Sequence, residues 1–459
     1  MVGKPRTTNR RLPTCSRVCK NVAAQFQDQA APPRKAHAIH LLAKAATQIR
    51  SRACKSVAKR HHHRMRKIIG VNLTWILCLV STLTGTASEW PEERLILDWQ
   101  PEHAHASSLV ELPNGDLLAC WFQGSGERTA DDVRVMGARL PKGAASWSAP
   151  FLMADTPGFP DCNPVLYLDA KERLWLMWIV VRANRWETSV LKYRRTKDYL
   201  NPGAPIWTWQ DIILLKPGED FPELVANGFR ETGFDESMWA EYARPYNQLI
   251  TEAAKDPLKR REGWMTRNHP VKLSSGRLLL PLYNDGYNMG LAALSDDEGE
   301  TWRASRPMVG VAGIQPTIVE RENGDLVAYL RETGRPPYRV QQSISHDQGE
   351  TWSALQETAI PNPSASLQVL RLKQSKGWAM IFNDSDQRRE KLSVAISMDE
   401  GISWPYKRVI SKRSDGSYPS MIETSDGWIH VSCSVKSEGK KGIAHYRIDP
   451  KWVLSQKVD

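Results

Sequence analysis

Cysteine is scarce in this chain and is poorly placed for disulfides or for metal binding. Only seven of the 459 residues are cysteine, and beyond residue 90 only Cys120, Cys162 and Cys433 remain. An odd number of cysteines at such distances gives no disulfide framework and no zinc-ligand spacing. At most one pair could form, and we expect buried thiols instead. No pattern in the sequence predicts a cofactor or a metal site.

A basic surface is missing from most of the chain, although the formal net charge of the whole sequence is +11. Residues 1–67 carry 17 Lys and Arg and one acid, Asp28, which leaves 45 basic and 50 acidic residues in the remainder. The remainder therefore has a net charge of −5 and no basic stripe that could follow a phosphate backbone. We expect no nucleic-acid partner.

No hydrophobic run is long and apolar enough for a stable membrane span. The run Ile68–Leu83 contains Asn72 and several hydroxyl residues, follows the cationic stretch Met65-Arg66-Lys67 and precedes small residues. These are the three regions of a secretory signal peptide. An uncleaved anchor is the alternative.

The predicted domain plan follows from this leader. We expect a basic extension over residues 1–64 that is not part of the mature protein, a signal peptide over residues 65–88, and one folded domain over residues 89–459. The mature protein would be secreted or periplasmic. If the basic extension is instead a genuine disordered tail, His61–His63 is a solvated run and not a metal site.

One eight-residue pattern with fixed Ser, Asp, Gly and Trp occurs three times, and its copies begin 50 and 52 residues apart. The copies are SDDEGETW (Ser295–Trp302), SHDQGETW (Ser345–Trp352) and SMDEGISW (Ser397–Trp404). The pattern suits a turn in which Ser and Asp bind backbone N–H groups, Gly has a positive φ and Trp packs on the next strand. We therefore assign Asp297, Asp347 and Asp399 a structural role and not a catalytic one.

The segments between these turns predict an all-β fold. Each repeat contains three short extended runs before the turn, and four strands in 40 to 50 residues are typical of a β-propeller blade. With degenerate copies at both ends we count six blades, the last of which lacks its outer strand. Arg94–Trp99 is expected to supply that strand and close the ring. A helix-prone insert, about residues 217–263, separates blades two and three.

A polar residue opens the first strand of each predicted blade, and five of these residues directly precede proline, which favours an extended conformation. Equivalent positions in six blades would surround one central funnel. The residues are His105, Asn163, His269, Gln315, Asn362 and Tyr418.

Three Asp boxes on a six-bladed plan resemble the sialidase superfamily, the BNR or Asp-box propellers, over about residues 95–449. In that family three arginines bind the substrate carboxylate, a tyrosine is the nucleophile, a glutamate polarises it, and an aspartate is the acid/base. The tyrosine nucleophile is an exception to the two-carboxylate scheme of most glycosidases.

The resemblance implies a role for several residues of this chain. Tyr418 of SYPSMI would be the nucleophile, and Arg331 of VAYLRETG one of the carboxylate-binding arginines. Arg389, with Arg388 as the fallback, would be another. The acid/base would be one of two residues in ERTADDVRV, which are Asp131 and Asp132.

Two positions depart from the family pattern. Where the family opens its first blade with arginine, this chain has His105, which is a weaker and pH-dependent partner for a carboxylate. Where the family has the glutamate partner of the tyrosine, sixteen residues before Arg331, this chain has Gln315. Since glutamine cannot take a proton, Tyr418 would lose its general base. Binding of an acidic sugar survives on Arg331 and Arg389.

Three functions therefore remain open. The first is a secreted, sialidase-like glycoside hydrolase that removes an acidic sugar from glycan ends. The second is a lyase or unusual glycosidase acting on uronate-containing glycans, with His105 or His269 as base, Tyr418 as acid and Arg331 neutralising the uronate. The third is a non-catalytic propeller that binds an acidic glycan or glycoconjugate.

Overall fold

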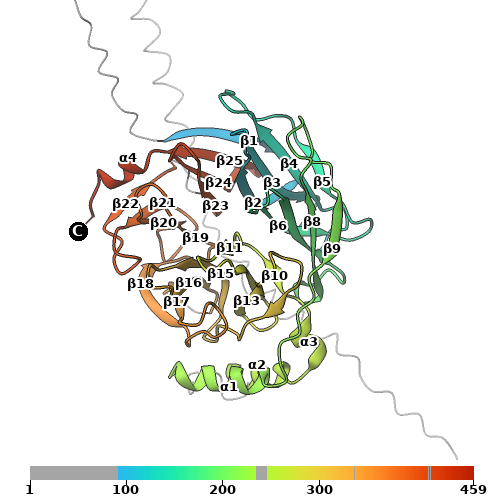
Figure 1. Ribbon diagram of the computed structural model, residues 1–459, viewed down its shortest axis with the longest axis vertical. Helices are drawn as coiled ribbons and strands as arrows, with labels where there is room; N and C mark the ends of the chain where they lie inside the picture. Colours follow the sequence, from blue (N-terminus) through green and yellow to red (C-terminus); the bar gives the residue numbers. More distant parts are fainter. Residues whose placement is uncertain (1–90, 234–244, 335, 412, 414, 459) are drawn as a thin grey trace, which may run out of the picture. The chain divides into compact units, whose positions relative to one another are not determined.

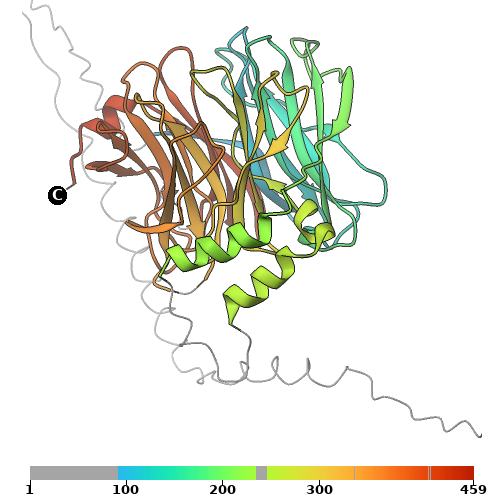
Figure 2. The ribbon, with the colours of Figure 1, turned by 60° about the horizontal axis from the view of Figure 1, so that its bottom comes forward.

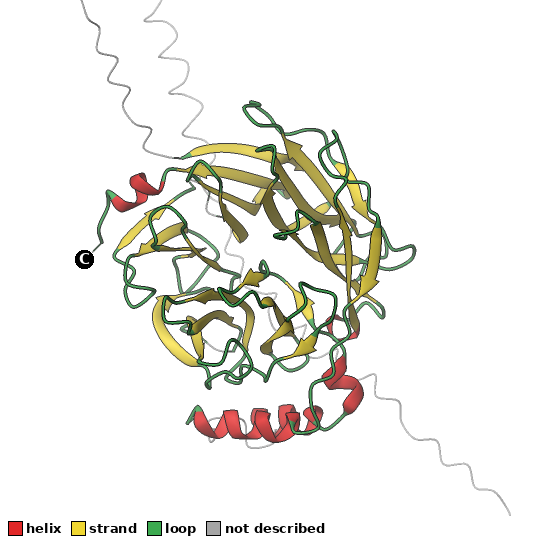
Figure 3. Cartoon of the chain, in the orientation of Figure 1, coloured by secondary structure: helices red, strands yellow, loops and turns green. Residues whose placement is uncertain are grey.

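The computed structural model describes residues 91–458 apart from 234–244, 335, 412 and 414. The predicted basic extension and signal peptide lie outside the described residues. Six antiparallel sheets are arranged around a central axis, so the prediction of a six-bladed β-propeller is confirmed (Figure 1). Strands are the main regular elements of this unit and helices are few (Figure 3).

Each of the first five blades is continuous in sequence. Blade one consists of β2 (His103–Glu111), β3 (Leu117–Gly124), β4 (Arg134–Leu140) and β5 (Phe151–Ala154). Blade two consists of β6 (Asp161–Leu168), β7 (Leu174–Val181), β8 (Ser189–Thr196) and β9 (Trp209–Ile212). Blade three consists of β10 (Met265–Thr266), β11 (Val271–Lys272), β12 (Leu278–Asn284), β13 (Met289–Ser295) and β14 (Arg303–Ala304). Blade four consists of β15 (Gly313–Glu320), β16 (Leu326–Glu332), β17 (Arg339–Ser345) and β18 (Gln356–Pro361). Blade five consists of β19 (Gln368–Arg371), β20 (Trp378–Asn383), β21 (Leu392–Ser397) and β22 (Tyr406–Val409).

Blade six joins the two ends of the described chain. It contains β23 (Ser417–Glu423), β24 (Ile429–Ser437) and β25 (Lys440–Ile448), and β1 (Glu92–Gln100) pairs antiparallel with β25 as its outer strand. Leu95 lies opposite Ala444 in this pairing. The predicted closure of the ring by Arg94–Trp99 is therefore confirmed.

Three helices lie between β9 and β10, in the segment predicted to be an insert, and a short 3-10 turn, η1 (Trp186–Thr188), precedes β8. The helices are α1 (Phe221–Glu231), α2 (Tyr246–Ala254) and α3 (Pro257–Arg261), and they gather on one side of the propeller (Figure 2). Helix α1 buries Phe221, Val225 and Phe229, which are four residues apart and form one apolar face. A last helix, α4 (Pro450–Leu454), follows β25. In the described part of the chain no helix is long and apolar enough to cross a bilayer.

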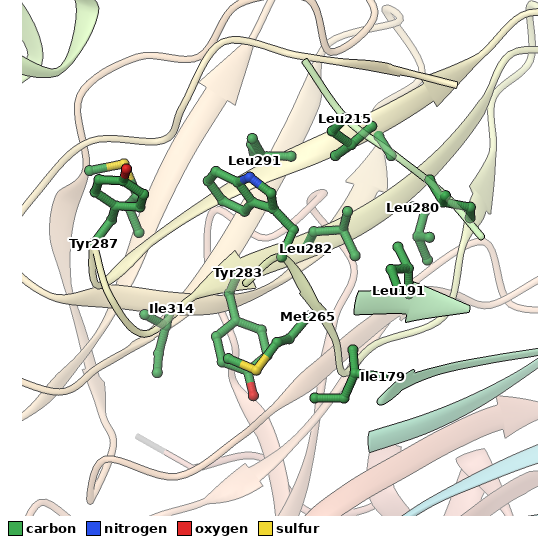
Figure 4. Close-up of a cluster of buried hydrophobic side chains, with 14 of the residues drawn as sticks. Ile179, Leu191, Leu215, Met265, Leu280, Leu282, Tyr283, Tyr287, Leu291 and Ile314 are labelled. Atoms are coloured by element: carbon green, nitrogen blue, oxygen red, sulfur yellow. The ribbon is translucent and has the colours of Figure 1, made fainter. Parts of the chain in front are cut away.

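The core lies mainly between neighbouring blades. The largest cluster joins blades two and three to the insert, and it includes Ile179, Leu191, Leu282 and Leu291 (Figure 4). These strands are buried on both faces, which explains their nearly continuous hydrophobic runs. The three cysteines are free and buried, as expected, and all belong to these clusters: Cys120, Cys162 and Cys433.

The Asp boxes connect the third and fourth strands of blades three, four and five. In the second box Asp347 accepts hydrogen bonds from Ser345 Oγ at 2.8 Å, Thr351 N at 2.9 Å and Thr351 Oγ1 at 2.6 Å. Gly349 has a φ of 87°, and the residue before it, Gln348, also has a positive φ. The first and third boxes repeat these bonds, so the predicted structural role of the three aspartates matches their geometry.

A bulge with a positive φ interrupts the first strand of four blades at the opposite end from the Asp boxes, and in blade five a residue with positive φ precedes the first strand. The residues with positive φ are Ala106, Asn163, Gln315, Ser364 and Tyr418. First strands begin and second strands end here, whereas third strands end at the boxes. The bulge breaks the regular alternation of side chains along the strand. A side chain at such a position can therefore point toward the propeller axis.

Candidate active site

Tyr418 lies in the bulge of β23 and is surrounded by charged side chains from other blades. Its φ is 53°, a strained value for a large side chain. The hydroxyl oxygen accepts a hydrogen bond of 2.6 Å from Nη1 of Arg331, which stands near the end of β16 in blade four. The side chain is partly buried, so part of it reaches solvent. The structure thus brings together the two residues that the SYPSMI and VAYLRETG motifs single out.

Three arginines surround the ring of Tyr418. Their guanidinium carbons lie 5.5 Å (Arg267), 5.6 Å (Arg331) and 5.0 Å (Arg389) from the ring centroid. Arg389 is exposed, follows β20 and donates to the carbonyl oxygen of Ser364. Arg388 is also exposed, and its described bonds involve only its backbone, from its N–H to Ser385 Oγ and from the N–H of Glu390 to its carbonyl oxygen. We call Tyr418, His105 and the three arginines the Tyr418 cluster.

Arg267 was not predicted from the sequence. It precedes His269 by two residues in the interrupted first strand of blade three and is only 3% exposed. Its guanidinium donates to the carbonyl oxygens of Ser107 at 3.3 Å and Pro419 at 2.7 Å, and so it links blade three to blades one and six. Burial lowers the pKa of this arginine to about 10, which leaves it charged at neutral pH.

The arginines of the Tyr418 cluster have no acidic partner within hydrogen-bonding distance. In the described part of the chain Arg267, Arg331 and Arg389 form bonds to backbone or to Tyr418 but no ion pair with a carboxylate. Burying positive charge without a counter-ion is costly. The arrangement is therefore suited to a ligand that brings its own negative charge.

The same charges act on the phenol. Burial opposes ionisation of Tyr418, but the positive charges of Arg331 and Arg389 and the hydrogen bond from Arg331 outweigh it and lower the pKa of the hydroxyl. An oxygen that is more easily ionised is a better nucleophile at neutral pH than an ordinary tyrosine. The cluster can thus activate Tyr418 without a glutamate.

His105 packs directly against Tyr418, with ring centroids 4.1 Å apart. Burial lowers the pKa of this imidazole well below its usual range, and the nearby charges of His103 and Arg267 lower it further. His105 is therefore neutral at physiological pH. It cannot act as the pH-dependent cation considered from the sequence, although a neutral imidazole can accept a proton.

Gln315 and Asn163 lie beside the cluster and meet at Tyr283. Asn163 Nδ2 donates to the hydroxyl oxygen of Tyr283 at 3.0 Å, and Gln315 also hydrogen bonds to this tyrosine. Figure 4 shows Tyr283 next to Met265 at the edge of the hydrophobic cluster. Both predicted residues therefore hold a neighbouring phenol, and burial raises the pKa of that phenol.

Asp131 and Asp132 have other partners. Asp132 is exposed and accepts bonds from the backbone N–H and the Oγ of Ser125, which close the loop between β3 and β4. Asp131, also exposed, accepts a bond of 3.0 Å from Asn184 in the neighbouring loop of blade two. The described contacts of the two carboxylates fasten loops and do not include Tyr418.

His269 faces the other end of the propeller axis. Its Nε2 is 3.0 Å from Ser108 Oγ and its Nδ1 is 2.8 Å from Gln368 Nε2. It lines a cavity of about 380 Å³ whose other walls are the last residues of first strands, such as Glu320 and Glu423. Burial lowers the pKa of His269 to about 4. The structure does not bring His269 to Tyr418, because blade three carries Arg267 at that place.

A second residue missed by the sequence analysis is Asp285, which directly follows β12. It is partly buried, and its charge and that of Arg331 influence each other's pKa. Its place in the sequence was a usable signal. Asp285 comes just after the second strand of blade three, and Arg331 lies near the end of the second strand of blade four. Among the described residues no group of three or more His, Cys, Asp or Glu could hold a metal ion.

Comparisons with known proteins agree with this fold. The model of the BNR repeat-like domain family matches residues 115–231 and 262–431. An anhydrosialidase from Macrobdella decora is 28% identical over 176 residues, which are 34% of this chain and 23% of that protein. The chain thus matches less than a quarter of that relative's length.

Solved structures with a similar fold include sialidases. A leech intramolecular trans-sialidase complexed with 2,7-anhydro-Neu5Ac has a TM-score of 0.58 at 14% identity over 81% of this chain and 72% of that one. The NanB sialidase from Streptococcus pneumoniae has a TM-score of 0.57 at 12% identity over 78% and 70%. A protein of unknown function from Dyadobacter fermentans has a TM-score of 0.57 at 16% identity over 78% and 98%.

Proposed function

Because the chain belongs to the BNR repeat-like domain family, within the sialidase-like superfamily, we propose that it is a glycoside hydrolase that removes an acidic sugar from glycan ends. The observation that carries the proposal is the 2.6 Å hydrogen bond from Arg331 to the hydroxyl of Tyr418, inside a group of three arginines without carboxylate partners in the described chain. We further propose, from the sequence alone, that the mature protein is exported.

The arginines have two tasks in this proposal. Arg331 and Arg389 bind the carboxylate of the sugar, because a charge-assisted hydrogen bond to a guanidinium is among the strongest available in a protein. Arg267 is too buried to reach far and contributes fixed positive charge below the phenol. Together they keep Tyr418 easy to ionise, which offsets the missing glutamate.

Tyr418 is the nucleophile of the proposed reaction. Ionised to the phenolate, its oxygen bonds to the anomeric carbon while the bond from that carbon to the leaving oxygen breaks, and water later attacks the same carbon and releases the phenolate and the sugar. Gln315 has no proton-accepting role here. It orients Tyr283 through a hydrogen bond, and Asn163 does the same from blade two.

A second function, elimination from a uronate-containing glycan, is favoured by one observation. The neutral imidazole of His105 lies against Tyr418, so a base and an acid stand side by side. His105 would remove the proton next to the uronate carboxylate, the bond to the leaving oxygen would break, and Tyr418 would donate the proton to that oxygen. His269, at the far end of the axis, is not part of this proposal.

Product analysis tests both functions. The protein is incubated with sialyllactose and with a uronate-containing oligosaccharide, and the products are followed as free reducing sugar and as the ultraviolet absorbance of an unsaturated uronate. We expect free sialic acid and no absorbance change. An unsaturated uronate would replace the hydrolase proposal by the lyase. Binding without any product would leave only the non-catalytic alternative.

A further inference from the structure

Asp285 is the first residue of the turn between β12 and β13, at the end of the propeller where β16 of blade four places Arg331. The hydroxyl of Tyr283 meets Asn163 beside the Tyr418 cluster. Asp285, two residues further along the chain, is partly buried. Within the described chain it forms no side-chain hydrogen bond.

The helical insert holds the short loop that carries Asp285. Asn284 Nδ2 donates to the carbonyl oxygen of Glu262 at 2.7 Å, and Gly286 N donates back to Asn284 Oδ1 at 2.8 Å. Beyond the loop, Tyr287 stacks on Trp264 with centroids 6.3 Å apart. Its hydroxyl donates to the carbonyl oxygen of Ala253 in α2 at 3.3 Å.

These contacts fix both ends of the loop. Tyr287 also meets Phe221 of α1 edge to face, at 5.8 Å between centroids. The insert therefore fixes the backbone on both sides of Asp285. A catalytic carboxyl group needs this kind of support, because small displacements of a reacting group cost a large part of the rate.

Two carboxyl groups on this side of the cluster have opposite environments. Burial raises the pKa of Asp285, and the negative charges of Glu187 and Glu127 raise it further, against the opposing charges of Arg331 and Arg128. Glu127 differs, because its close pairing with His103, 3.6 Å away, holds its pKa below the usual range. One group thus keeps its proton to higher pH while the other is ionised, which is how acid and base roles are divided between carboxyl groups.

We propose that Asp285 is the acid of the reaction, donating a proton to the leaving-group oxygen from a loop held by the helical insert. The assignment rests on the proposed hydrolase function. As the oxygen of Tyr418 bonds to the anomeric carbon, the bond from that carbon to the leaving oxygen breaks and this oxygen takes the proton of Asp285. In the second step the Asp285 carboxylate takes a proton from the water that displaces Tyr418. Asp131 and Asp132, implied by the family resemblance, fasten loops instead.

Leaving-group dependence tests the assignment. Asp285→Asn, Asp131→Asn and the exposed-strand control Asp98→Asn are assayed on the 4-nitrophenyl and methyl α-glycosides of N-acetylneuraminic acid. A nitrophenolate leaves without protonation, whereas methoxide does not. We expect Asp285→Asn to reduce kcat/KM by about 10²–10⁴-fold on the methyl glycoside, and by less than about tenfold on the nitrophenyl glycoside, since the acid is then dispensable.

The pH profile gives a second readout that does not depend on the fraction of folded protein. An acid must be protonated to work, so activity of the native protein on the methyl glycoside falls as pH rises through the pKa of Asp285. In Asp285→Asn this alkaline fall should vanish. Equal losses on both glycosides, or a leaving-group-dependent loss in Asp131→Asn, would overturn the assignment. Inactivity of the native protein on both glycosides would overturn the proposed hydrolase function itself.

Discussion

At one end of the propeller arginines are neutralised by carboxylates from the next blade, and at the other end they are not. Arg195 of blade two binds both oxygens of Glu300 in the first Asp box, at 2.7 and 2.9 Å. Arg277 of blade three likewise reaches Glu350 in the second box at 2.8 Å. The guanidinium groups around Tyr418 have no such partner in the described chain.

This difference separates charges that hold the fold from charges that await a ligand. An arginine paired with a carboxylate at a blade boundary is satisfied without a ligand, and its removal affects only the contact between blades. A partly buried arginine without a counter-ion costs folding free energy, and that cost can be recovered when an anion binds. The arginines at the Tyr418 end are therefore suited to binding an anion, while those at the Asp-box end hold neighbouring blades together.

The strongest test of this contrast is Tyr418→Phe. The variant keeps the ring that packs on His105 but removes the oxygen that accepts the bond from Arg331. We expect kcat on a sialoside to fall by at least about 10³-fold, because a residue that forms the covalent intermediate has no substitute. Thermal unfolding should change little. Full activity of Tyr418→Phe on every substrate of the native protein would place the reaction elsewhere.

Removing single arginines should give a graded result. Arg331→Ala should weaken binding of N-acetylneuraminic acid by a hundredfold or more, since a desolvated carboxylate that loses its partner costs about 2–5 kcal/mol. Arg389→Ala should cost about 1 kcal/mol or less, because an exposed guanidinium is screened by water. Calorimetric titration measures both affinities.

The paired end supplies the control for this series. Arg303 binds Glu350 in the second Asp box, so Arg303→Ala should leave the affinity unchanged. If the carboxyl-reduced sugar bound to the native protein as tightly as the acid, the arginines would not be reading a carboxylate. Equal losses in all three variants would erase the proposed difference between the two ends.

The smallest effect is expected at the Asp boxes, where stability and not turnover should respond. Asp347→Ala leaves the backbone N–H of Thr351 without its acceptor, which should lower the free energy of unfolding by about 1–2 kcal/mol. kcat/KM of the folded variant should equal that of the native protein. Denaturant titration and steady-state kinetics check the two expectations.

Low pH should reduce the stability that the Asp-box turns contribute to the fold. Burial opposes ionisation of Asp347, but hydrogen bonds from Thr351 and Ser345 outweigh it and lower the pKa of the folded state. Such a group stabilises the fold above its unfolded pKa of about 3.9, and this contribution is lost as pH falls through the lower folded value. The stability difference between the native protein and Asp347→Ala should therefore shrink below about pH 4. A constant difference down to the acid limit would show that the charge is irrelevant.

The fold could be predicted because its signals are local and repeated. Ser, Asp, Gly and Trp must recur in each box to form the same turn, so the spacing of Trp302, Trp352 and Trp404 marks blade boundaries directly. The closing strand was also predictable, because the last blade visibly lacks one strand and only one extended run was left unassigned.

The site could be predicted only in part. Tyr418, Arg331 and Arg389 occupy positions that a motif fixes, and the structure brings them together. Asp285 was missed although its place after the second strand of blade three marked it, whereas Arg267 was missed because its position depends on the register of the first strand of that blade. There the first strand is split into β10 and β11, and two extra residues displace the pattern that places a polar residue before proline. A residue count cannot reveal such a bulge, which is set by packing against neighbouring blades.

The pairing of β1 with β25 has a consequence for biosynthesis. On the ribosome the strand that closes the ring is made before any blade, yet its partner is made last. Until translation is nearly complete, the backbone of β1 lacks its partner strand, although Ile96 and Leu97 can already pack on blade one. Contacts between residues so distant in sequence form slowly, because the loop entropy is lost before the contact is gained. The ring of blades therefore remains unclosed between β1 and β25 until synthesis is nearly finished. The unpaired edges of these two strands are where we expect chaperones to be needed most.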